Sequence, residues 1–343
     1  MDQGFLHSLV IRLSSHPFSV LTPERILDAV EAQGYRCDGR INALNSFENR
    51  VFQLGIEGGL PLIAKFYRPA RWSYDQILEE HAFCAELTAA EWPVVPPLIG
   101  PNGQSAHRDG EFVFALFTRF GGHAPELDKL DTIELLGRSL GRLHAVGALS
   151  PFQHRPAINM EDYGVASREF LLSSDSIPTN LREAYDTLTR DILKIVEVRF
   201  RDCRYAAIRL HADCHRGNIL WRDDRAVFVD FDDCRMGPAV QDLWMLLSGD
   251  RQEQTEQLDA LLEGYEMFHE FDDRELSLVE SLRTFRMMHY AAWIARRWSD
   301  PAFPPAFSWF NTERYWAEHI LSLREQFAIL QEEPLSRPRG NFG

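Results

Sequence analysis

Three polar residues with spacing suited to phosphate chemistry lie in the second half of the chain: Asp213, Asn218 and Asp230. Two short apolar runs, 219–221 and 226–229, flank a polar turn and predict a β-hairpin. In such a hairpin Asn218 lies opposite Asp230 at the open end, and opposed residues are about 5 Å apart. An amide and a carboxylate at that separation, with a second carboxylate nearby, suit Mg²⁺, which shares oxygen ligands with phosphates.

This arrangement is the one that phosphoryl transfer requires. Asp213 is placed to orient a hydroxyl nucleophile and accept its proton, while Asn218 and Asp230 hold a metal ion on the phosphates of a nucleotide. The plain alternative is a polar hairpin that binds no ligand. A zinc site is a further alternative, but no C-x-x-C pair supports it; its ligands would be His211, Cys214, His215 and Cys234.

The elements that must position these residues follow from hydrophobic periodicity. The first third mixes helix and strand, with a helix over 22–34 that has Thr22 as its N-cap and Pro23 at its first position. Next come strands over 50–56, 61–67 and 111–118 and a helix over 74–90. After Gly121 the chain is mostly helical, over 132–145, 165–200, 241–248, 253–269, 273–298 and 312–331. Gly137 and Gly141 predict close packing of the helix that contains them.

This order of elements predicts an α+β fold with two lobes. We expect a small β-rich N-lobe over residues 1–117 and a larger, mainly helical C-lobe over residues 118–343. The length of 343 residues agrees with two lobes or two domains.

Composition narrows the class of protein. With 51 acidic and 36 basic residues the formal charge is −15, which excludes binding to the nucleic-acid backbone as a primary role. No apolar run approaches the ~18 residues that span a bilayer, and 1–20 lacks the layout of a signal peptide. The five cysteines are scattered and odd in number, which suits a reducing compartment. We therefore expect a cytoplasmic monomer with no membrane or nucleic-acid partner.

The motif around the hairpin resembles that of a known superfamily. His211-Ala-Asp-x4-Asn218-Ile-Leu, followed by Val229-Asp-Phe-Asp232, is similar to the catalytic core of the aminoglycoside phosphotransferases and choline kinases, which have a protein-kinase-like fold. Four stretches resemble the stress response kinase A family of bacterial Ser/Thr protein kinases more closely. They are 45–51, 64–69 with 76–81, 211–220, and 287–298. The resemblance implies an ATP- and Mg²⁺-dependent kinase that acts on Ser/Thr hydroxyls of proteins in bacterial stress response and survival.

The resemblance also implies how the first lobe would contact ATP. Lys65, on the strand over 61–67, would contact the α- and β-phosphates, and Glu80 on the next helix would pair with it. Glu79 is the rival for that pairing by one position. Helical spacing favours Glu80, because Cys84 and Leu87 continue its face.

The turn that would cover the phosphates is unusual for a protein kinase. Residues 46–50 contain no glycine, whereas protein kinases use a glycine-rich loop at this place. Backbone N–H groups and the side chains of Ser46 and Asn49 are the expected phosphate contacts. From the resemblance, adenine would contact the backbone near Phe117, Thr118 and Arg119.

Several residues receive supporting or structural roles. Asp242 resembles the buried aspartate that braces the catalytic loop in this superfamily, and His211 is expected to pack under that loop. Asp232 is either a further metal ligand or a hydrogen-bonding residue behind the site. We expect Arg296 and Arg297 to lie on a solvated helix face. Four tryptophans are spaced mainly for helix packing, with an acceptor pocket as the alternative role: Trp293, Trp298, Trp309 and Trp316.

Three functions stay open at this point. The first is a Ser/Thr protein kinase, and the second is a small-molecule kinase of the same fold that acts on a choline-, homoserine- or aminoglycoside-type acceptor. The third is a nucleotide-binding pseudokinase scaffold. That scaffold is disfavoured because such proteins usually lack at least one residue of a set that is complete here: Lys65, Asp213, Asn218 and Asp230.

Overall fold

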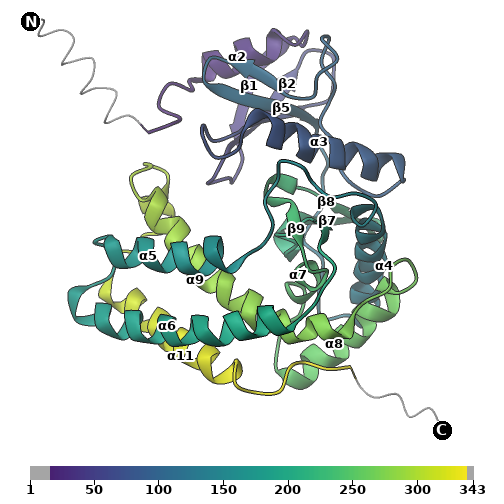
Figure 1. Cartoon of the computed structure of the whole chain (residues 1–343). Helices are drawn as coiled ribbons and strands as arrows, with labels where there is room; N and C mark the ends of the chain where they lie inside the picture. The colour runs from purple at the N-terminus through teal and green to yellow at the C-terminus, as the bar shows by residue number, and fades with distance from the viewer. Residues whose placement is uncertain (1–15, 338–343) are drawn as a thin grey trace, which may run out of the picture. The chain divides into compact units, whose positions relative to one another are not determined.

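The computed structural model describes residues 16–337 and confirms the α+β fold. Its contacts divide the chain into two compact units, each discontinuous in sequence (Figure 1). The first unit contains the described residues up to Ala82, then Val95–Phe120 and Arg297–Ala306. The second contains Phe83–Val94, Gly121–Arg296 and the described residues from Phe307 onward. The division expected between residues 117 and 118 follows chain order alone, whereas these contacts assign Arg297–Ala306 to the first unit.

A five-stranded antiparallel sheet forms the centre of the first unit. The strand order is β1-β2-β3-β5-β4, which places β3 at the middle of the sheet. The strands are β1 (Cys37–Ala43), β2 (Arg50–Ile56), β3 (Leu62–Phe66), β4 (His107–Asp109) and β5 (Phe112–Thr118). Three of them match the expected strands to within one residue at either end, and β1 and β4 are additional.

The alternation of side chains in β3 decides which residues face the chemistry. Ala64 and Phe66 join the core under α2 (Pro23–Glu31), together with Phe114 of β5. Successive residues of a strand point to opposite faces, so Lys65 lies on the other face of the sheet. Figure 1 shows α2 and the first part of α3 (Tyr74–Ala89) on opposite sides of this sheet. The pleat therefore directs Lys65 toward α3.

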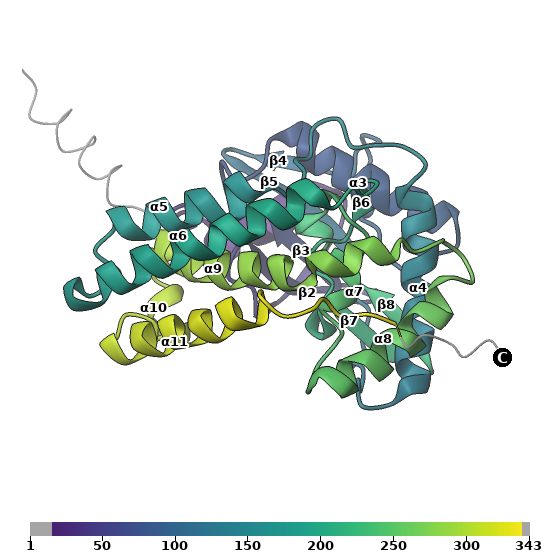
Figure 2. The same cartoon turned by 60° about the horizontal axis from the view of Figure 1, so that its bottom comes forward.

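The second unit is built mainly from helices. Helix α4 (Leu130–Gly147) packs along α8 (Arg251–Tyr265). Three other long helices run beside one another in Figure 2: α6 (Thr179–Asp202), α9 (Val279–Arg297) and α11 (Glu313–Ile329). Shorter helices are α5 (Ala166–Ser173), α7 (Val240–Trp244) and α10 (Phe303–Ala306), the last in the first unit. Short π- and 3₁₀-helical turns complete the helical part: Glu161–Val165, Arg216–Asn218, Phe231–Asp233 and Asp273–Leu278.

Gly137 and Gly141 confirm the close packing expected of α4. A Cβ atom at Gly137 would lie 2.0 Å from the carbonyl oxygen of Leu261 on α8, and one at Gly141 would lie 2.2 Å from that of Tyr265. No side chain fits at these distances, so α8 approaches α4 at backbone contact. The contact fixes the position of Tyr265, which belongs to the buried network described below.

Two small sheets position the polar residues of the second unit. β6 (Ile208–Leu210) pairs with β9 (Arg235–Gly237), and β7 (Ile219–Arg222) pairs with β8 (Arg225–Phe228). The chain runs from β6 through the Asp213 loop into the β7–β8 hairpin and returns through Asp230 to β9. Both ends of the motif are thus held by one two-stranded ladder.

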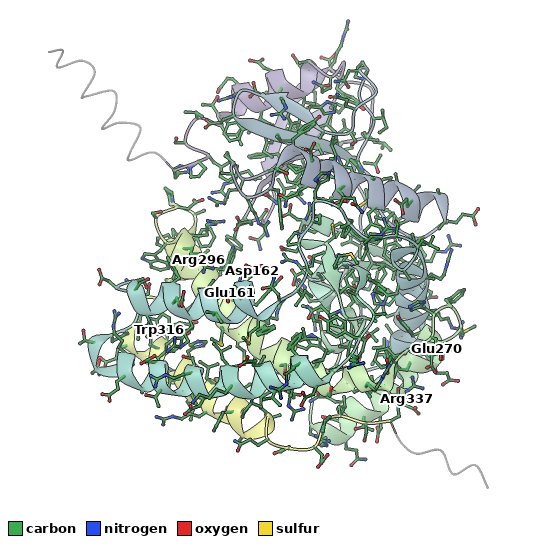
Figure 3. All side chains as sticks on the ribbon, in the orientation of Figure 1. Glu161, Asp162, Glu270, Arg296, Trp316 and Arg337 are labelled. Atoms are coloured by element: carbon green, nitrogen blue, oxygen red, sulfur yellow. The ribbon has the colours of Figure 1, made fainter. Side chains whose placement is uncertain are left out.

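The tryptophans and the Arg296–Arg297 pair of the C-terminal helices differ in how deeply they are buried. Trp316 (labelled in Figure 3) is fully buried on α11, where that helix packs on α6. Trp309, in contrast, is 44% exposed. The expectation of a solvated arginine pair is wrong. Arg296 donates to the carbonyl oxygen of Ala166, and Arg297 forms an ion pair with Glu48.

None of the helices in residues 16–337 is both long and apolar enough to cross a membrane.

Candidate active site

The β7–β8 hairpin has a register one residue different from the one expected. A two-residue turn, Asp223–Asp224, joins the strands, and both residues have positive φ, 52° and 55°. Such a tight turn fixes the pairing, and it places Asn218 opposite Val229, whose N–H donates to the Asn218 carbonyl oxygen over 3.0 Å. Asp230 is the next residue along, so the predicted opposition of Asn218 and Asp230 is wrong by one position.

Asp230 adopts a backbone conformation that is uncommon for a residue other than glycine. Its φ and ψ are 63° and 61°, in the left-handed region, and Ala212 beside Asp213 also has a positive φ of 69°. Each such residue costs of order 1–3 kcal/mol and persists only where the surroundings hold it. Two of them within one motif are typical of a functional site.

The loop between β6 and β7 brings Asp213 and Asn218 together. Asn218 Nδ2 donates to the Asp213 carbonyl oxygen over 3.0 Å and lies 3.4 Å from its carboxylate. His211 Nε2 lies 2.9 Å from the carbonyl oxygen of Val229, which can only accept, so Nε2 carries the proton. The buried His211 ring packs on Phe231 and joins the loop to the strand that leads into Asp230.

Two side chains act on the Asp213 carboxylate. Arg286, from α9, donates to Oδ1 over 2.6 Å, and His215 Nε2 lies 3.5 Å from Oδ2. Burial raises the pKa of Asp213, but the hydrogen bond from His215 and the charge of Arg286 lower it by more. The pKa therefore lies below the ordinary value of an aspartate, and the group is ionised at neutral pH, as a proton acceptor must be.

The donor set near Asp213 fits a hard divalent cation. Because Asn218 turns its amide nitrogen toward Asp213, its Oδ1 points the other way, and this oxygen with the Asp230 carboxylate offers the ligand type that Mg²⁺ prefers. Among residues 16–337 no group of three or more His, Cys, Asp or Glu side chains could hold a metal ion. Four candidate zinc ligands therefore form no such site here: His211, Cys214, His215 and Cys234.

Asp242 braces the loop from the start of α7. Its carboxylate, fully buried, accepts from the His211 N–H over 2.8 Å and from the Ala212 N–H over 2.7 Å. His144 Nε2 lies 3.1 Å from the same carboxylate, and its Nδ1 lies 2.8 Å from the Tyr265 hydroxyl. Burial raises the pKa of Tyr265, so its O–H donates to Nδ1 and leaves Nε2 protonated toward Asp242. The network holds Ala212 in its left-handed conformation.

Glu275 in turn holds the helix that carries Asp242. Its buried carboxyl group accepts from the Val240 N–H at the start of α7 over 2.9 Å. Burial raises the pKa of Glu275 to about 7, although the hydrogen bond from Val240 acts in the opposite direction. This group therefore changes its protonation within the physiological range.

The raised pKa of Glu275 predicts a pH-dependent stability. Between about pH 4.5 and 7 the folded chain keeps a proton that the unfolded chain releases, so the free energy of unfolding falls as pH rises through this window, by at most about 3 kcal/mol. Glu275→Gln keeps an acceptor for the Val240 N–H but cannot ionise. Urea unfolding at pH 5 and pH 8 should show a smaller loss in this variant than in the wild type. Equal losses in both proteins would contradict the assignment.

Lys65 and Glu80 form an ion pair in the first unit. Lys65 Nζ lies 3.7 Å from Glu80 Oε1, and both side chains are buried. The Tyr67 hydroxyl donates to the same carboxylate oxygen over 3.2 Å, and the Lys65 ammonium lies 4.9 Å from the centre of the Tyr67 ring. Between Glu79 and Glu80, the structure thus places Glu80 beside the lysine, and Glu79 is only partly buried.

The two side chains expected to contact phosphate serve the turn itself. Ser46 Oγ donates to the carbonyl oxygen of Asn49, and Asn49 Oδ1 accepts from the Arg68 N–H over 3.0 Å. At the end of β5, Phe117 is opposite Ile63, and Arg119 Nε donates to Gln53 Oε1 over 2.7 Å. The structure therefore brings Ser46 and Asn49 together, while Phe117 and Arg119 lie along the sheet.

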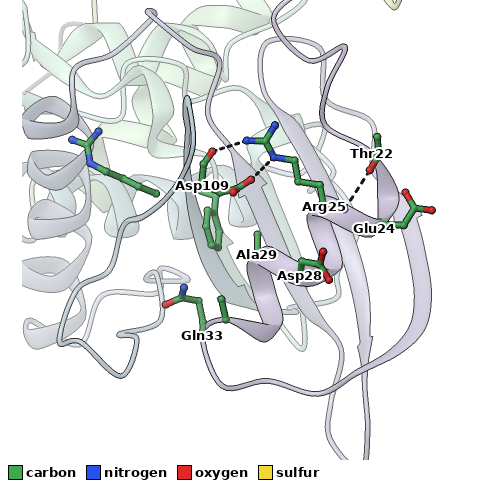
Figure 4. A pocket seen from close by; sticks show the side chains of 10 residues that line it. Thr22, Glu24, Arg25, Asp28, Ala29, Gln33 and Asp109 are labelled. Atoms are coloured by element: carbon green, nitrogen blue, oxygen red, sulfur yellow. Dashed lines mark hydrogen bonds and ion pairs between the residues drawn. The ribbon is translucent and has the colours of Figure 1, made fainter.

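A cavity of about 410 Å³ lies elsewhere in the first unit, beside α2 (Figure 4). Arg25 Nε donates to the Asp109 carboxylate over 2.5 Å and Nη2 to its carbonyl oxygen over 3.0 Å. None of the residues predicted to bind nucleotide or metal lines this cavity. It therefore contributes nothing to the chemistry considered above.

Comparison with known families decides the assignment. The sequence profile of the phosphotransferase enzyme family matches residues 40–279, which include every residue of the Lys65–Glu80 pair, the catalytic loop and Asp242. The chain belongs to this phosphotransferase enzyme family. Its described fold and its motif order are those expected from the resemblance to aminoglycoside phosphotransferases and choline kinases, and that resemblance is confirmed.

Bacterial kinases resemble this phosphotransferase over nearly their whole length. Stress response kinase A of Escherichia coli K12 is 45% identical over 322 residues, which cover 94% of this chain and 97% of that protein. A protein of Salmonella typhimurium named serine/threonine protein kinase RdoA is 46% identical over 318 residues, covering 93% of this chain. The resemblance to the stress response kinase A family is thus confirmed.

Solved structures of other kinases share the fold. An amicoumacin kinase, in complex with AMP-PNP, Ca²⁺ and its ligand, has a TM-score of 0.70 at 18% identity and covers 90% of this chain and 93% of its own. A microcompartment-associated aminopropanol kinase has a TM-score of 0.66 at 17% identity, covering 88% and 96%. At these identities the likeness concerns the phosphotransferase fold.

Two residues of the phosphotransferase site are absent from the expectations drawn from sequence. Arg286 contacts Asp213 although the two lie far apart in the chain; its one signal is its place directly before the 287–298 stretch. The buried Arg155 donates to the carbonyl oxygen of Asp232 over 2.5 Å and so holds the turn that follows Asp230. Asp232 itself is buried in that turn, which supports the role of a residue behind the site.

Proposed function

We propose that this phosphotransferase moves the γ-phosphate of ATP to Ser or Thr hydroxyl groups of proteins, in bacterial stress response and survival. The observation that carries the proposal is the 45–46% identity, over nearly the full chain, to proteins named stress response kinase A and serine/threonine protein kinase RdoA. Identity at that level extends over residues of both units, whereas the solved structures of other kinases share only the fold.

The residues of the second unit supply the acceptor chemistry. Asp213, ionised beside Arg286, accepts the proton of the Ser or Thr hydroxyl as its oxygen bonds to the γ-phosphorus. The bond from that phosphorus to the bridging oxygen of ADP breaks, and ADP leaves. Asn218 orients Asp213 through its amide group, and Asp242 and His211 keep the loop in place.

The nucleotide contacts in this proposal follow from the resemblance to the family. Lys65, held by Glu80, contacts the α- and β-phosphates, and backbone N–H groups of the 46–50 turn contact the others. Asn218 and Asp230 would hold Mg²⁺, which neutralises phosphate charge when bound. The adenine contacts proposed near Phe117 and Arg119 rest on the family resemblance.

A small-molecule acceptor is the second candidate. It is favoured by one observation, the shared fold of kinases named for amicoumacin and aminopropanol. A pseudokinase is disfavoured because the chain retains the residues for transfer: Lys65, Asp213, Asn218 and Asp230.

Transfer of labelled γ-phosphate tests these alternatives in one experiment. The full chain is incubated with Mg²⁺ and labelled ATP, together with a casein-like protein and a panel of choline, homoserine and an aminoglycoside. We expect label on Ser and Thr of the protein. Label only in a small alcohol would overturn the protein-kinase proposal, and ATP binding without any transfer would favour the scaffold.

A further inference from the structure

Two arginine side chains bind the backbone carbonyl groups of the turn between β1 and β2. Arg50 Nη1 donates to the carbonyl oxygens of Phe47 and Asn49, over 3.0 and 3.1 Å. Arg68 Nε donates to the carbonyl oxygen of Glu48 over 2.9 Å, and its Nη2 lies 3.3 Å from that of Phe47. Three consecutive carbonyl groups of the turn thus point at two guanidinium groups.

Peptide geometry then fixes where the N–H groups of the turn point. In a planar trans peptide the N–H of a residue points opposite to the C=O of the residue before it. With the carbonyls of Phe47 and Glu48 directed at arginine, the N–H groups of Glu48 and Asn49 point away from the guanidinium groups. A row of oriented backbone N–H groups is an anion-binding element.

A carboxylate from a distant part of the sequence holds both arginines. Asp300, in the segment Arg297–Ala306 of the first unit, accepts from Arg50 Nη2 with both oxygens, over 2.8 and 3.0 Å, and from Arg68 Nη2 over 2.7 Å. The side chain of Asp300 is 2% exposed and that of Arg68 is 4% exposed. Such buried, multiply bonded ion pairs fix geometry strongly, because removing one partner leaves a buried charge.

The same segment contacts the turn at two further points. Arg297 donates to the Glu48 carboxylate, with Nη2 2.7 Å from Oε1. The ring of Phe303 packs edge-on against Phe47, with centroids 6.1 Å apart. Residues 297–306 therefore hold the turn in three ways. Asp300 holds the two arginines that bind its backbone carbonyl groups, Arg297 binds the Glu48 carboxylate, and Phe303 packs on the Phe47 ring.

These contacts explain how the turn keeps its conformation although it contains no glycine. No residue of 44–49 has a positive φ, so the turn needs no residue with the freedom of glycine. Its conformation is set by arginines and a carboxylate instead of by backbone flexibility.

We propose that Asp300 is a positioning residue for ATP, which orients the N–H groups of Glu48 and Asn49 in the 46–50 turn toward the phosphates through Arg50 and Arg68. The proposal rests on the proposed function, in which that turn contacts the nucleotide phosphates. Asp300 does not itself touch ATP; it determines the affinity for the phosphates.

Asp300→Asn tests the proposal with a matched control. The variant keeps the shape but loses the charge, and we expect the KM and Kd for ATP to rise about tenfold, with kcat changed less than about threefold. Affinity for adenosine, measured by competition, should stay within about twofold, because adenosine has no phosphate. The control Asp109→Asn removes another aspartate–arginine pair of the same unit, next to the cavity of Figure 4, and should leave all these values unchanged.

The possible results separate the two proposals. An unchanged Kd for ATP in folded Asp300→Asn overturns the positioning role. An equal loss of affinity for ATP and adenosine also overturns it, because such a loss indicates that the whole nucleotide site is less ordered. If Asp300→Asn does not fold, Arg297→Gln serves, since it removes only the Glu48 contact of a partly exposed side chain. It should raise the Kd for ATP about threefold, and no rise overturns the role. A wild type that binds no ATP refutes the proposed function instead.

Discussion

Replacing Asp213 with asparagine should lower kcat by about 10² to 10⁴, the usual contribution of a positioned general base. Asparagine has nearly the same shape and can still accept from Arg286, but it cannot take a proton from the acceptor hydroxyl. The Lys65–Glu80 pair is unaffected, so the Kd for ATP should stay within about twofold of the wild-type value. Labelled phosphate transfer at saturating ATP and a separate ATP-binding titration measure the two quantities.

The matched control for this substitution is Asp224→Asn. Asp224 lies in the two-residue turn of the β7–β8 hairpin, is exposed, and has a positive φ that asparagine tolerates. This variant should transfer phosphate at the wild-type rate. Wild-type turnover in Asp213→Asn would refute the role of Asp213 as the base.

Asp242→Asn should destabilise the second unit by about 3 kcal/mol and abolish most phosphate transfer. The carboxylate accepts two backbone N–H groups and faces His144 Nε2–H, all of them buried. An asparagine has one acceptor oxygen, so at least one of these donors would face an amide NH₂ group. Ala212 would then lose the contact that holds its left-handed conformation, and Asp213 would move with it.

Chemical denaturation with urea measures the stability loss, and phosphate transfer measures the loss of activity. Asp191→Asn is the control, because it removes the exposed ion pair with Lys194 and should cost less than about 0.5 kcal/mol. Unfolding curves of Asp242→Asn that superimpose on those of the wild type would contradict the bracing role.

The fold was predictable from the sequence where burial is periodic. β2 agrees residue for residue with the expected strand over 50–56, and α3 agrees to within one residue. β1 escaped prediction because most of Cys37–Ala43 is exposed and lacks alternation; its pairing with β2 is what makes it a strand. The helix expected over 165–200 is divided between α5 and α6, where the polar stretch before Pro178 ends the first helix.

The site was predictable where its residues are close in the sequence. Asp213, Asn218 and Asp230 lie in one loop and hairpin, so their spacing carries information about their geometry. The register differs by one because a two-residue turn at positive φ cannot be distinguished by composition from a three-residue one. Arg286 reaches Asp213, and Asp300 reaches Arg50 and Arg68, only through tertiary packing, for which no local pattern exists.

The membership of Arg297–Ala306 in the first unit has a consequence for biosynthesis. At roughly 5–20 residues per second, Arg297 leaves the ribosome's catalytic centre about 9 to 35 seconds after Phe120. During that interval the nascent chain contains Arg50 and Arg68, stacked in the finished fold over Phe18, without the carboxylate of Asp300. The first unit therefore completes its folding only after most of the second unit has been synthesised, so the order of folding is not the order of translation.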